Sequence, residues 1–273
     1  MISIDSNMII RSQSYSLYLA SISSTICLIL VYFWATGGSS VENYLGGLTL
    51  KSPNLCTWHA ALMITGMCFC LIQAAVSFRL FRIDHYLAKL LHFFWHSCAI
   101  ILSISGIVCM FKFKRDNVHL SNISSLHSWL GLCTLILYGQ NYVLGFLYFL
   151  SPIFKRQVDM KRNYLRFHKY FGYMTLVSAV VTMQAGIVQK NKTGGCSYRI
   201  YKVDNDPASH YHDIPNGCKL SMGIGILMTL ALCLFFYGTV ELVPGDRYNE
   251  SSKRSPASSH KTQVHVQVIS SKV

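Results

Sequence analysis

Apolar residues are gathered into six long blocks, and polar segments separate these blocks from one another. Each block holds about 20 residues, the length that an α-helix needs to cross the hydrocarbon of a bilayer. Backbone groups inside the hydrocarbon must be hydrogen-bonded within their own segment, so blocks of this length are expected to be helices. The pattern therefore predicts an all-α bundle of six transmembrane helices, at about 16–36, 56–78, 92–111, 127–150, 169–188 and 220–243.

Composition supports the same class. Hydrophobic residues make up 52% of the 273 residues and charged residues only 13%, whereas a soluble domain has about 25% charged residues. Disordered, collagen-like and nucleic-acid-binding proteins are excluded on these grounds. The first block lacks a basic start and a small-residue cleavage site, so we expect a retained helix. We expect three parts: a cytoplasmic N-terminus at 1–15, a six-helix membrane domain at 16–243 and a disordered, Ser-rich cytoplasmic tail at 244–273.

The formal net charge of +13 comes from basic clusters between the apolar blocks. Six spans place both termini on one side of the membrane, and the segments on that side hold 15 Lys and Arg residues against 9 on the other side. Cytoplasmic segments are enriched in Lys and Arg, so both termini are predicted to be cytoplasmic.

Features of the opposite side agree with this orientation. Cys196 and Cys218 are the two cysteines well clear of the spans, and both lie in the last non-cytoplasmic loop, where a disulfide persists. The glycosylation motifs at Asn191 and Asn122 fall on the same side, while the motif at Asn249 lies in the cytoplasmic tail and should be silent.

Ionisable residues inside membrane spans are costly and indicate function. Each of the four central spans carries a histidine near its predicted start: His59, then His92 or His96, then His127 and His168. Successive spans run in opposite directions, so these starts alternate between the two faces. One pair of histidines is therefore expected near the outer face and the other near the inner face.

Two histidines at one depth on different helices suit a bis-histidine haem. Zinc suits them poorly, because a structural zinc site needs four ligands and no Cys or carboxylate set lies at matching depth. With each ligand about one turn inside its face, the two irons would lie roughly 20 Å apart along the membrane normal. The pattern thus favours two haem b sites held by the four central helices, which together would conduct electrons across the membrane.

Other interpretations of the histidines stay open at this point. A single interfacial histidine is more often a hydrogen-bonded or snorkelling residue than a ligand. The histidines would also suit a proton-coupled transporter, although such proteins commonly have broken helices and internal repeats that are not evident here. A structural four-helix scaffold would not need histidines in depth-matched pairs.

The residues around the histidines resemble the cytochrome b561 family of ascorbate-reducible transmembrane di-haem cytochromes. The segment 58–63 (Trp-His-Ala-Ala-Leu-Met), followed by Gly66 and Arg79, is similar to the second helix of that family. The segment 89–92 (Lys-Leu-Leu-His), followed by His96, is similar to the family's third helix, in which the first histidine is the ligand. The resemblance therefore selects His92.

The segments 125–131 (Ser-Leu-His-Ser-Trp-Leu-Gly) and 166–172 (Arg-Phe-His-Lys-Tyr-Phe-Gly) are similar to the starts of the family's fourth and fifth helices. The resemblance covers about 16–243 and implies that His59 and His127 hold the outer haem while His92 and His168 hold the inner one. It implies an ascorbate-dependent oxidoreductase that passes electrons from cytoplasmic ascorbate to monodehydroascorbate or ferric iron outside. It also implies a homodimer. A quinol-dependent cytochrome, which differs in its donor, stays open.

An ascorbate anion at the inner face needs fixed positive charge near the haem edge. The candidates, of which Lys89 matches the family best, are Arg79, Lys89, Arg162 and Arg166. The competing interpretation is that these charges only anchor the helices at the cytoplasmic face.

At the outer face, many family members carry an aromatic–His pair after the third helix. This chain has Lys112, Lys114 and Arg115 there, with His119 further on, and such a cationic cluster would attract monodehydroascorbate or a ferric chelate. The segment 209–213 (Ser-His-Tyr-His-Asp) suggests iron capture, although a polar loop explains it more simply. The sequence does not distinguish the plasma membrane from an endosomal, lysosomal or secretory-vesicle membrane.

Overall fold

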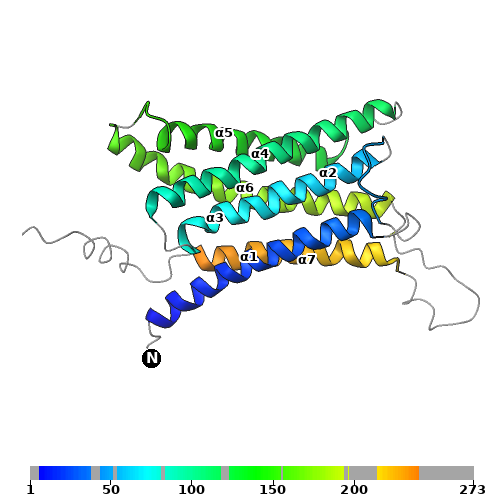
Figure 1. Cartoon of the computed structure of the whole chain (residues 1–273), viewed down its shortest axis with the longest axis horizontal. Coiled ribbons are helices and arrows are strands. Elements are labelled where there is room, and N and C mark those ends of the chain that lie inside the picture. Colours follow the sequence, from blue (N-terminus) through cyan, green and yellow to red (C-terminus); the bar gives the residue numbers. More distant parts are fainter. Residues whose placement is uncertain are drawn as a thin grey trace, which may run out of the picture.

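The computed structural model describes residues 6–37, 44–51, 54–80, 84–117, 123–154, 156–193, 196 and 214–239. Within these residues the chain is all-helical, and six helical spans are long and apolar enough to cross a membrane, as predicted (Figure 1). The helices are α1 (Ser6–Thr36), α2 (Leu55–Ile64), η3 (Thr65–Cys70), α3 (Leu71–Leu80), α4 (His85–Asp116), α5 (Leu126–Phe149), α6 (Val158–Thr193) and α7 (Asn216–Thr239). The predicted tail at 244–273 lies outside the described residues, as do 209–213, His119, Asn122 and Asn249.

The second span is one continuous rod built from α2, η3 and α3 (Figure 1). Its middle part, η3, is a π-helix, in which each backbone hydrogen bond spans one more residue than in the α-helix around it. Gly66 in η3 packs closely on α4: a Cβ at this position would lie 3.0 Å from the carbonyl oxygen of Ala99. The missing side chain thus allows the second and third spans to approach each other.

The helices α4 and α6 begin earlier than the apolar pattern predicted. The start of α4 is capped by Asp84, whose carboxylate accepts a hydrogen bond from the backbone N–H of Tyr86 at 2.9 Å. The first turn of α6 contains Asp159, which favours a helix N-terminus and lies 3.8 Å from Arg162. The Asp84 cap and the Asp159–Arg162 pair therefore support helix starts that lie before the apolar blocks. The expectation that His92 and His168 stand near their helix starts was wrong, since each lies two to three turns inside its helix.

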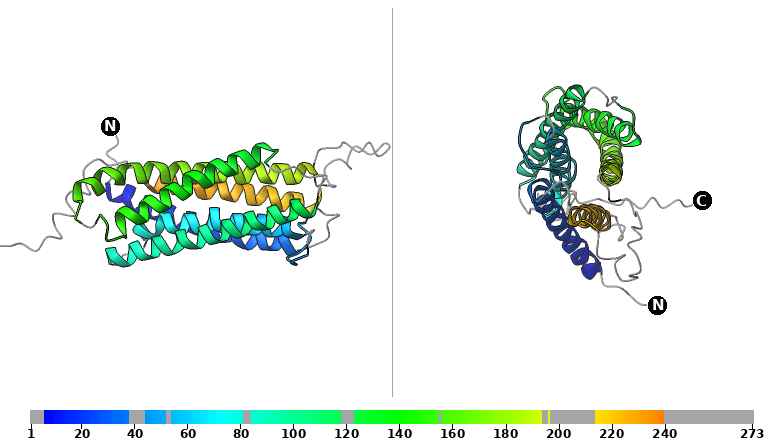
Figure 2. Two further views of the ribbon diagram at one scale, coloured as in Figure 1. Left: turned by 90° about the horizontal axis from the view of Figure 1, so that it is seen from above. Right: turned by 90° about the vertical axis from the view of Figure 1, so that its right-hand side faces the viewer.

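The helices pack as a bundle in which α1 lies against α7, α5 lies against α6, and α4 lies against α2 and α3 (Figure 2). Buried side chains such as Val31, Trp34, Leu71 and Met228 fill the contacts of α1 and α7 with the second span. We call the end of the bundle where α3 ends and α4 begins the inner end, following the predicted orientation, and the opposite end the outer end.

Large apolar side chains cover the outside of the bundle. Ile101, Ile136 and Ile226 are between 61% and 69% exposed. A soluble monomer rarely exposes contiguous apolar surface of this kind, whereas a transmembrane helix presents it to lipid.

Candidate functional site

The outer pair of histidines joins α2 to α5. The ring centres of His59 and His127 lie 6.1 Å apart, and the ring planes are inclined by 82°. Both side chains are half-buried. The structure therefore brings together the two residues that the sequence assigned to one site.

The inner pair joins α4 to α6. The ring centres of His92 and His168 lie 6.3 Å apart, and the planes are inclined by 67°. His96 stands one turn further along α4, with its ring centre 4.4 Å from that of His92. Its Nδ1 lies 3.1 Å from the hydroxyl of Tyr138, and that hydroxyl donates to the carbonyl of His96 at 2.9 Å. The geometry thus pairs His92 with His168 and gives His96 a partner of its own on α5.

Backbone carbonyls hold three of the four paired rings. Nδ1 of His59 donates to the carbonyl of Gly106 at 3.0 Å, and Nδ1 of His92 donates to that of Ala74 at 2.7 Å. Nδ1 of His127 donates to the carbonyl of Thr182 at 2.9 Å. A histidine that binds a metal commonly donates its other ring N–H to such an acceptor, which fixes the tautomer and the ring orientation. In these three residues Nε2 is the nitrogen left to act as a ligand.

Glycines make room for the remaining edges of two rings. A Cβ at Gly186 would lie 2.8 Å from Cε1 of His127, and a Cβ at Gly145 would lie 2.8 Å from Cε1 of His168. Each glycine belongs to the helix that packs against the helix of the histidine. The close packing of α5 on α6 therefore depends on two positions without side chains.

The pairs fit a planar metal cofactor. Two imidazoles that bind one metal ion from opposite sides through bonds of about 2 Å have ring centres about 6 Å apart, as both pairs do. Among the described residues no three His, Cys, Asp or Glu side chains gather as a metal site, so each pair would supply two ligands and a macrocycle the others. Trp58, beside His59, also has a buried indole N–H without a hydrogen-bond partner, which suits an absent polar group.

A large cavity opens beside the inner pair. It has a volume of about 1560 Å³ and is lined by residues of α1, the second span, α4, α5, α6 and α7, including His92, His96 and His168. Basic residues that line it are Arg79, Lys89, Lys161, Arg162 and Lys169. A small anion that enters this cavity meets several positive charges before it reaches the paired rings.

Comparison with known proteins identifies a family whose matched region contains the same histidines. The family model for eukaryotic cytochrome b561 matches residues 58–193, a range that contains all four paired histidines. A probable ascorbate-specific transmembrane electron transporter of Oryza sativa subsp. japonica is 30% identical over 177 residues, which cover 63% of this chain and 71% of the relative. The chain belongs to the cytochrome b561 family.

Two further relatives of this cytochrome b561 chain are named for their reactions. A transmembrane ascorbate ferrireductase of Arabidopsis thaliana is 28% identical, over 63% of this chain and 70% of its own length. A lysosomal membrane ascorbate-dependent ferrireductase of Homo sapiens is 27% identical, over 81% of this chain and 85% of its own length. Membership of the family implies haem b as the cofactor and makes the chain a transmembrane oxidoreductase.

The basic residues predicted for the inner site of this cytochrome b561 differ in their surroundings. Lys89 is half-buried, lines the cavity and precedes His92 by less than one turn of α4. Arg79 lines the cavity but also donates to the carbonyl of Gly238 at 2.8 Å, near the C-terminal end of α7. Arg162 lines the cavity and pairs with Asp159, whereas Arg166 is exposed and is not among the cavity-lining residues. Lys89 is thus the best-placed candidate of the four.

Sequence reasoning missed three cavity residues as candidates. His85, the first residue of α4, lines the cavity, and its ring centre lies 5.9 Å from that of Phe78, which is 5.0 Å from that of His92. Lys161 and Lys169 also line it from α6. Lys161 precedes His168 by two helical turns, so a helix that contained both residues would place them on one face. This signal was missed because the predicted start of the helix lay after both residues.

At the outer end, the basic cluster after the third span forms the last turns of α4. Lys112 and Arg115 are exposed, and Arg115 lies 4.0 Å from the carboxylate of Asp116. Lys114 is half-buried. Of the three predicted acceptor residues, Lys114 is therefore the one that the bundle partly covers.

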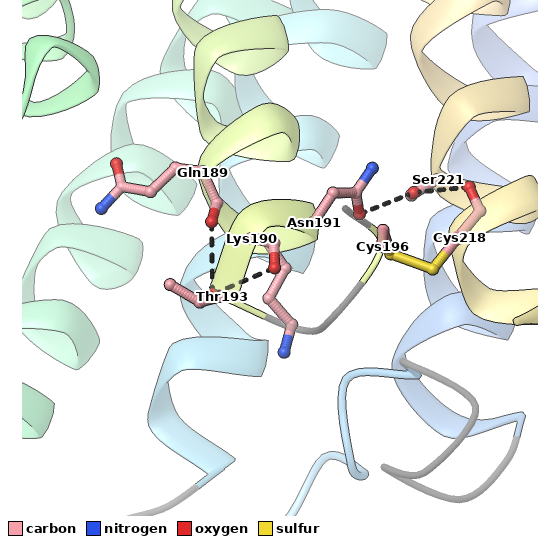
Figure 3. The surroundings of a disulfide bond; sticks show 7 residues. All are labelled: Gln189, Lys190, Asn191, Thr193, Cys196, Cys218 and Ser221. Carbon is pink, nitrogen blue, oxygen red and sulfur yellow. Dashed lines mark hydrogen bonds between the residues drawn. A yellow bond between two sulfur atoms is a disulfide. The ribbon is translucent and has the colours of Figure 1, made fainter. Parts of the chain in front are cut away.

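A disulfide between Cys196 and Cys218 links the segment after α6 to the first turn of α7 (Figure 3). Next to it, Asn191 lies in the last turn of α6, and its side-chain Oδ1 accepts a hydrogen bond from the Ser221 hydroxyl at 3.0 Å. The structure thus forms the bond that the positions of the two cysteines suggested. The glycosylation motif at Asn191 lies on a helix, where the asparagine contacts α7.

Proposed function

We propose that this cytochrome b561 transfers single electrons from ascorbate at its inner end, through two haem b groups, to monodehydroascorbate or a ferric chelate at its outer end. The observation that carries the proposal is the presence of one histidine pair at each end of the same four spans, with ring centres 6.1 Å and 6.3 Å apart. The named activities of the plant and human relatives support ascorbate as the donor.

Haem b, bound between the rings of each pair, would supply reversible one-electron chemistry. The chain itself determines which ring nitrogen of three of the histidines would bind the haem, since Nδ1 bonds to Gly106, Ala74 and Thr182 leave Nε2 as the ligand atom.

Lys89 would bind the ascorbate anion at the inner end. Its ammonium group carries a fixed positive charge in the cavity that His92 and His168 also line. Lys89 precedes His92 by three residues in α4. This charge attracts the anion and orients it toward the inner pair. Arg162, Lys161 and Lys169 would raise the local concentration of anions around the same cavity.

Lys114, with Lys112 and Arg115, would attract an anionic acceptor at the outer end. These cations lie at the end of α4 that is opposite to Lys89. Donor and acceptor would thus approach opposite ends of one helix, as transfer across a membrane requires. The cytoplasmic location of both termini and the homodimer remain predictions.

The proposal is tested on the full chain purified in detergent. We expect two b haems per chain, reduced by ascorbate in the reduced-minus-oxidised spectrum. A chain without haem would contradict the mechanism and favour the transporter, whereas haems indifferent to ascorbate would indicate a quinol or another donor. Proteoliposomes loaded with ascorbate then identify the acceptor, because ferric chelate or monodehydroascorbate outside should reoxidise the haems.

A further inference from the structure

Three of the four paired histidines follow a common rule in their hydrogen bonds, and the fourth, His168, lacks the corresponding partner. His59 on the second span donates to α4, and His92 on α4 donates back to the second span. His127 on α5 donates to α6. Reciprocity predicts that His168 on α6 donates back to α5, but Nδ1 of His168 is buried without a hydrogen-bond partner.

The spacing within each helix identifies where this partner should stand. The acceptors Gly106 and Thr182 follow the histidines of their own helices, His92 and His168, by 14 residues. In the second span, Ala74 follows His59 by 15 residues, and the π-helix η3 between them accounts for the extra one. The same spacing in α5, which contains His127, leads to position 141.

Asn141 occupies that position with a matching unsatisfied group. Its side chain is 9% exposed, and its Oδ1 is buried without a hydrogen-bond partner, as is Nδ1 of His168. Its Nδ2 already donates to the carbonyl of His168 at 3.4 Å, so the amide lies beside this residue. A buried donor and a buried acceptor that both lack partners are each costly, and a bond between them removes both costs.

The glycines beside the two histidines also indicate that Asn141 in α5 corresponds to Thr182 in α6. His127 packs on Gly186 and donates to Thr182, four residues before that glycine. His168 packs on Gly145 with the same 2.8 Å approach, and Asn141 stands four residues before Gly145 on the same face of α5. Residues four apart on a helix are neighbours, so Asn141 occupies the position in α5 that Thr182 occupies in α6. Thr182 accepts through its backbone carbonyl, whereas Asn141 also offers the buried side-chain Oδ1.

We infer that Asn141 is the positioning residue of the inner site: its side-chain Oδ1 accepts the Nδ1–H of His168, directly or through one water, and thereby fixes the ring of this ligand. The inference rests on the proposed function, because it takes His168 to be a ligand of the inner haem. An accepted Nδ1–H bond makes an imidazole a stronger donor to the metal, which stabilises the oxidised form. Asn141 would thus keep the midpoint potential of the inner haem lower than it would be if His168 lacked this hydrogen bond.

The test compares Asn141→Leu with the wild type in a spectroscopic redox titration, and His168→Ala identifies which haem signal is the inner one. We expect the midpoint potential of the inner haem to rise, its low-spin electron paramagnetic resonance signal to shift and the outer haem to stay unchanged. Asn141→Gln, which keeps the amide, should return both values toward the wild type. Gln140→Leu, which removes an exposed amide next to Asn141, should change neither.

An unchanged potential and resonance signal in Asn141→Leu would overturn the inference. A fall in thermal stability alone would show that Asn141 only supports the backbone of α6. Where Asn141→Leu does not fold, the smaller Asn141→Ala is compared in the same way. Wild-type chain without haem would instead refute the proposed function itself, and the inference with it. The two failures are therefore distinguished by the first measurement on the wild type.

Discussion

Gly186 and His127 are in direct contact across the α5–α6 interface, because a Cβ on Gly186 would lie 2.8 Å from Cε1 of the imidazole. No real side chain tolerates such an approach without displacing its neighbour. Since the same ring is also held by the carbonyl of Thr182 at 2.9 Å, it has little freedom to move aside. The outer histidine pair therefore depends on the absence of one methyl group on the facing helix.

We predict that Gly186→Ala displaces His127 and weakens the outer haem site. Overpacking of this kind typically costs about 1–3 kcal/mol, and here the cost falls on a ligand ring. Haem per chain and the reduced-minus-oxidised spectrum should show loss or alteration of the outer signal only. Gly139→Ala is the matched control on α5, since a Cβ there would meet nothing within 4 Å. Equal effects of both substitutions would refute the steric explanation.

Much of this arrangement could be predicted from the sequence, because lipid imposes a simple pattern. Apolar blocks of membrane length located the six spans, and alternation of helix direction paired His59 with His127 and either His92 or His96 with His168. The family resemblance then selected His92, whose ring is the one that faces His168. The first turns of α4 and α6 were missed, because a prediction from hydropathy follows only the apolar block. A capping residue and an ion pair can support helical turns outside that block. The contacts of Gly145 and Gly186 and the carbonyl acceptors depend on how the helices pack, which a single sequence does not encode as a pattern.

His92 and His96 are predicted to respond differently to removal. His92→Ala should abolish the inner haem signal, because the ring of His92 is the one on α4 that faces His168 at 6.3 Å. His96→Ala should keep that signal and lower stability by about 1–3 kcal/mol, since the buried Tyr138 hydroxyl loses its contact with Nδ1 of His96. Haem per chain and thermal unfolding separate the two outcomes. Loss of the inner haem in His96→Ala alone would reverse the ligand assignment.

Lys89 is predicted to matter more for ascorbate than Arg166, although both lie within one turn of a paired histidine. Lys89→Gln removes a charge that lines the cavity, so the KM for ascorbate should rise about five- to tenfold, which corresponds to about 1–1.4 kcal/mol. Arg166→Gln removes an exposed charge outside the cavity lining and should change KM by less than about twofold.

Initial rates of haem reduction at increasing ascorbate concentration provide the measurement for both variants. The difference between Lys89→Gln and the wild type should shrink at high salt, because added ions screen the ammonium group from the anion. Indistinguishable KM values for Lys89→Gln, Arg166→Gln and the wild type would show that these cations only orient the helices in the membrane.

The disulfide between Cys196 and Cys218 is predicted to stabilise the bundle without affecting electron transfer. It closes a segment of 22 residues between α6 and α7, and a cross-link over such a length contributes about 3 kcal/mol in the chain-entropy model. Cys218→Ser should therefore lower the thermal unfolding midpoint, and a reductant should destabilise the wild type but not this variant. Cys233→Ser, which removes an exposed free thiol on the same helix, should change neither. Because neither bonded cysteine is a proposed haem ligand, the haem spectrum of folded Cys218→Ser should equal that of the wild type. A shifted spectrum would show that the outer ends of α6 and α7 also position the ligands.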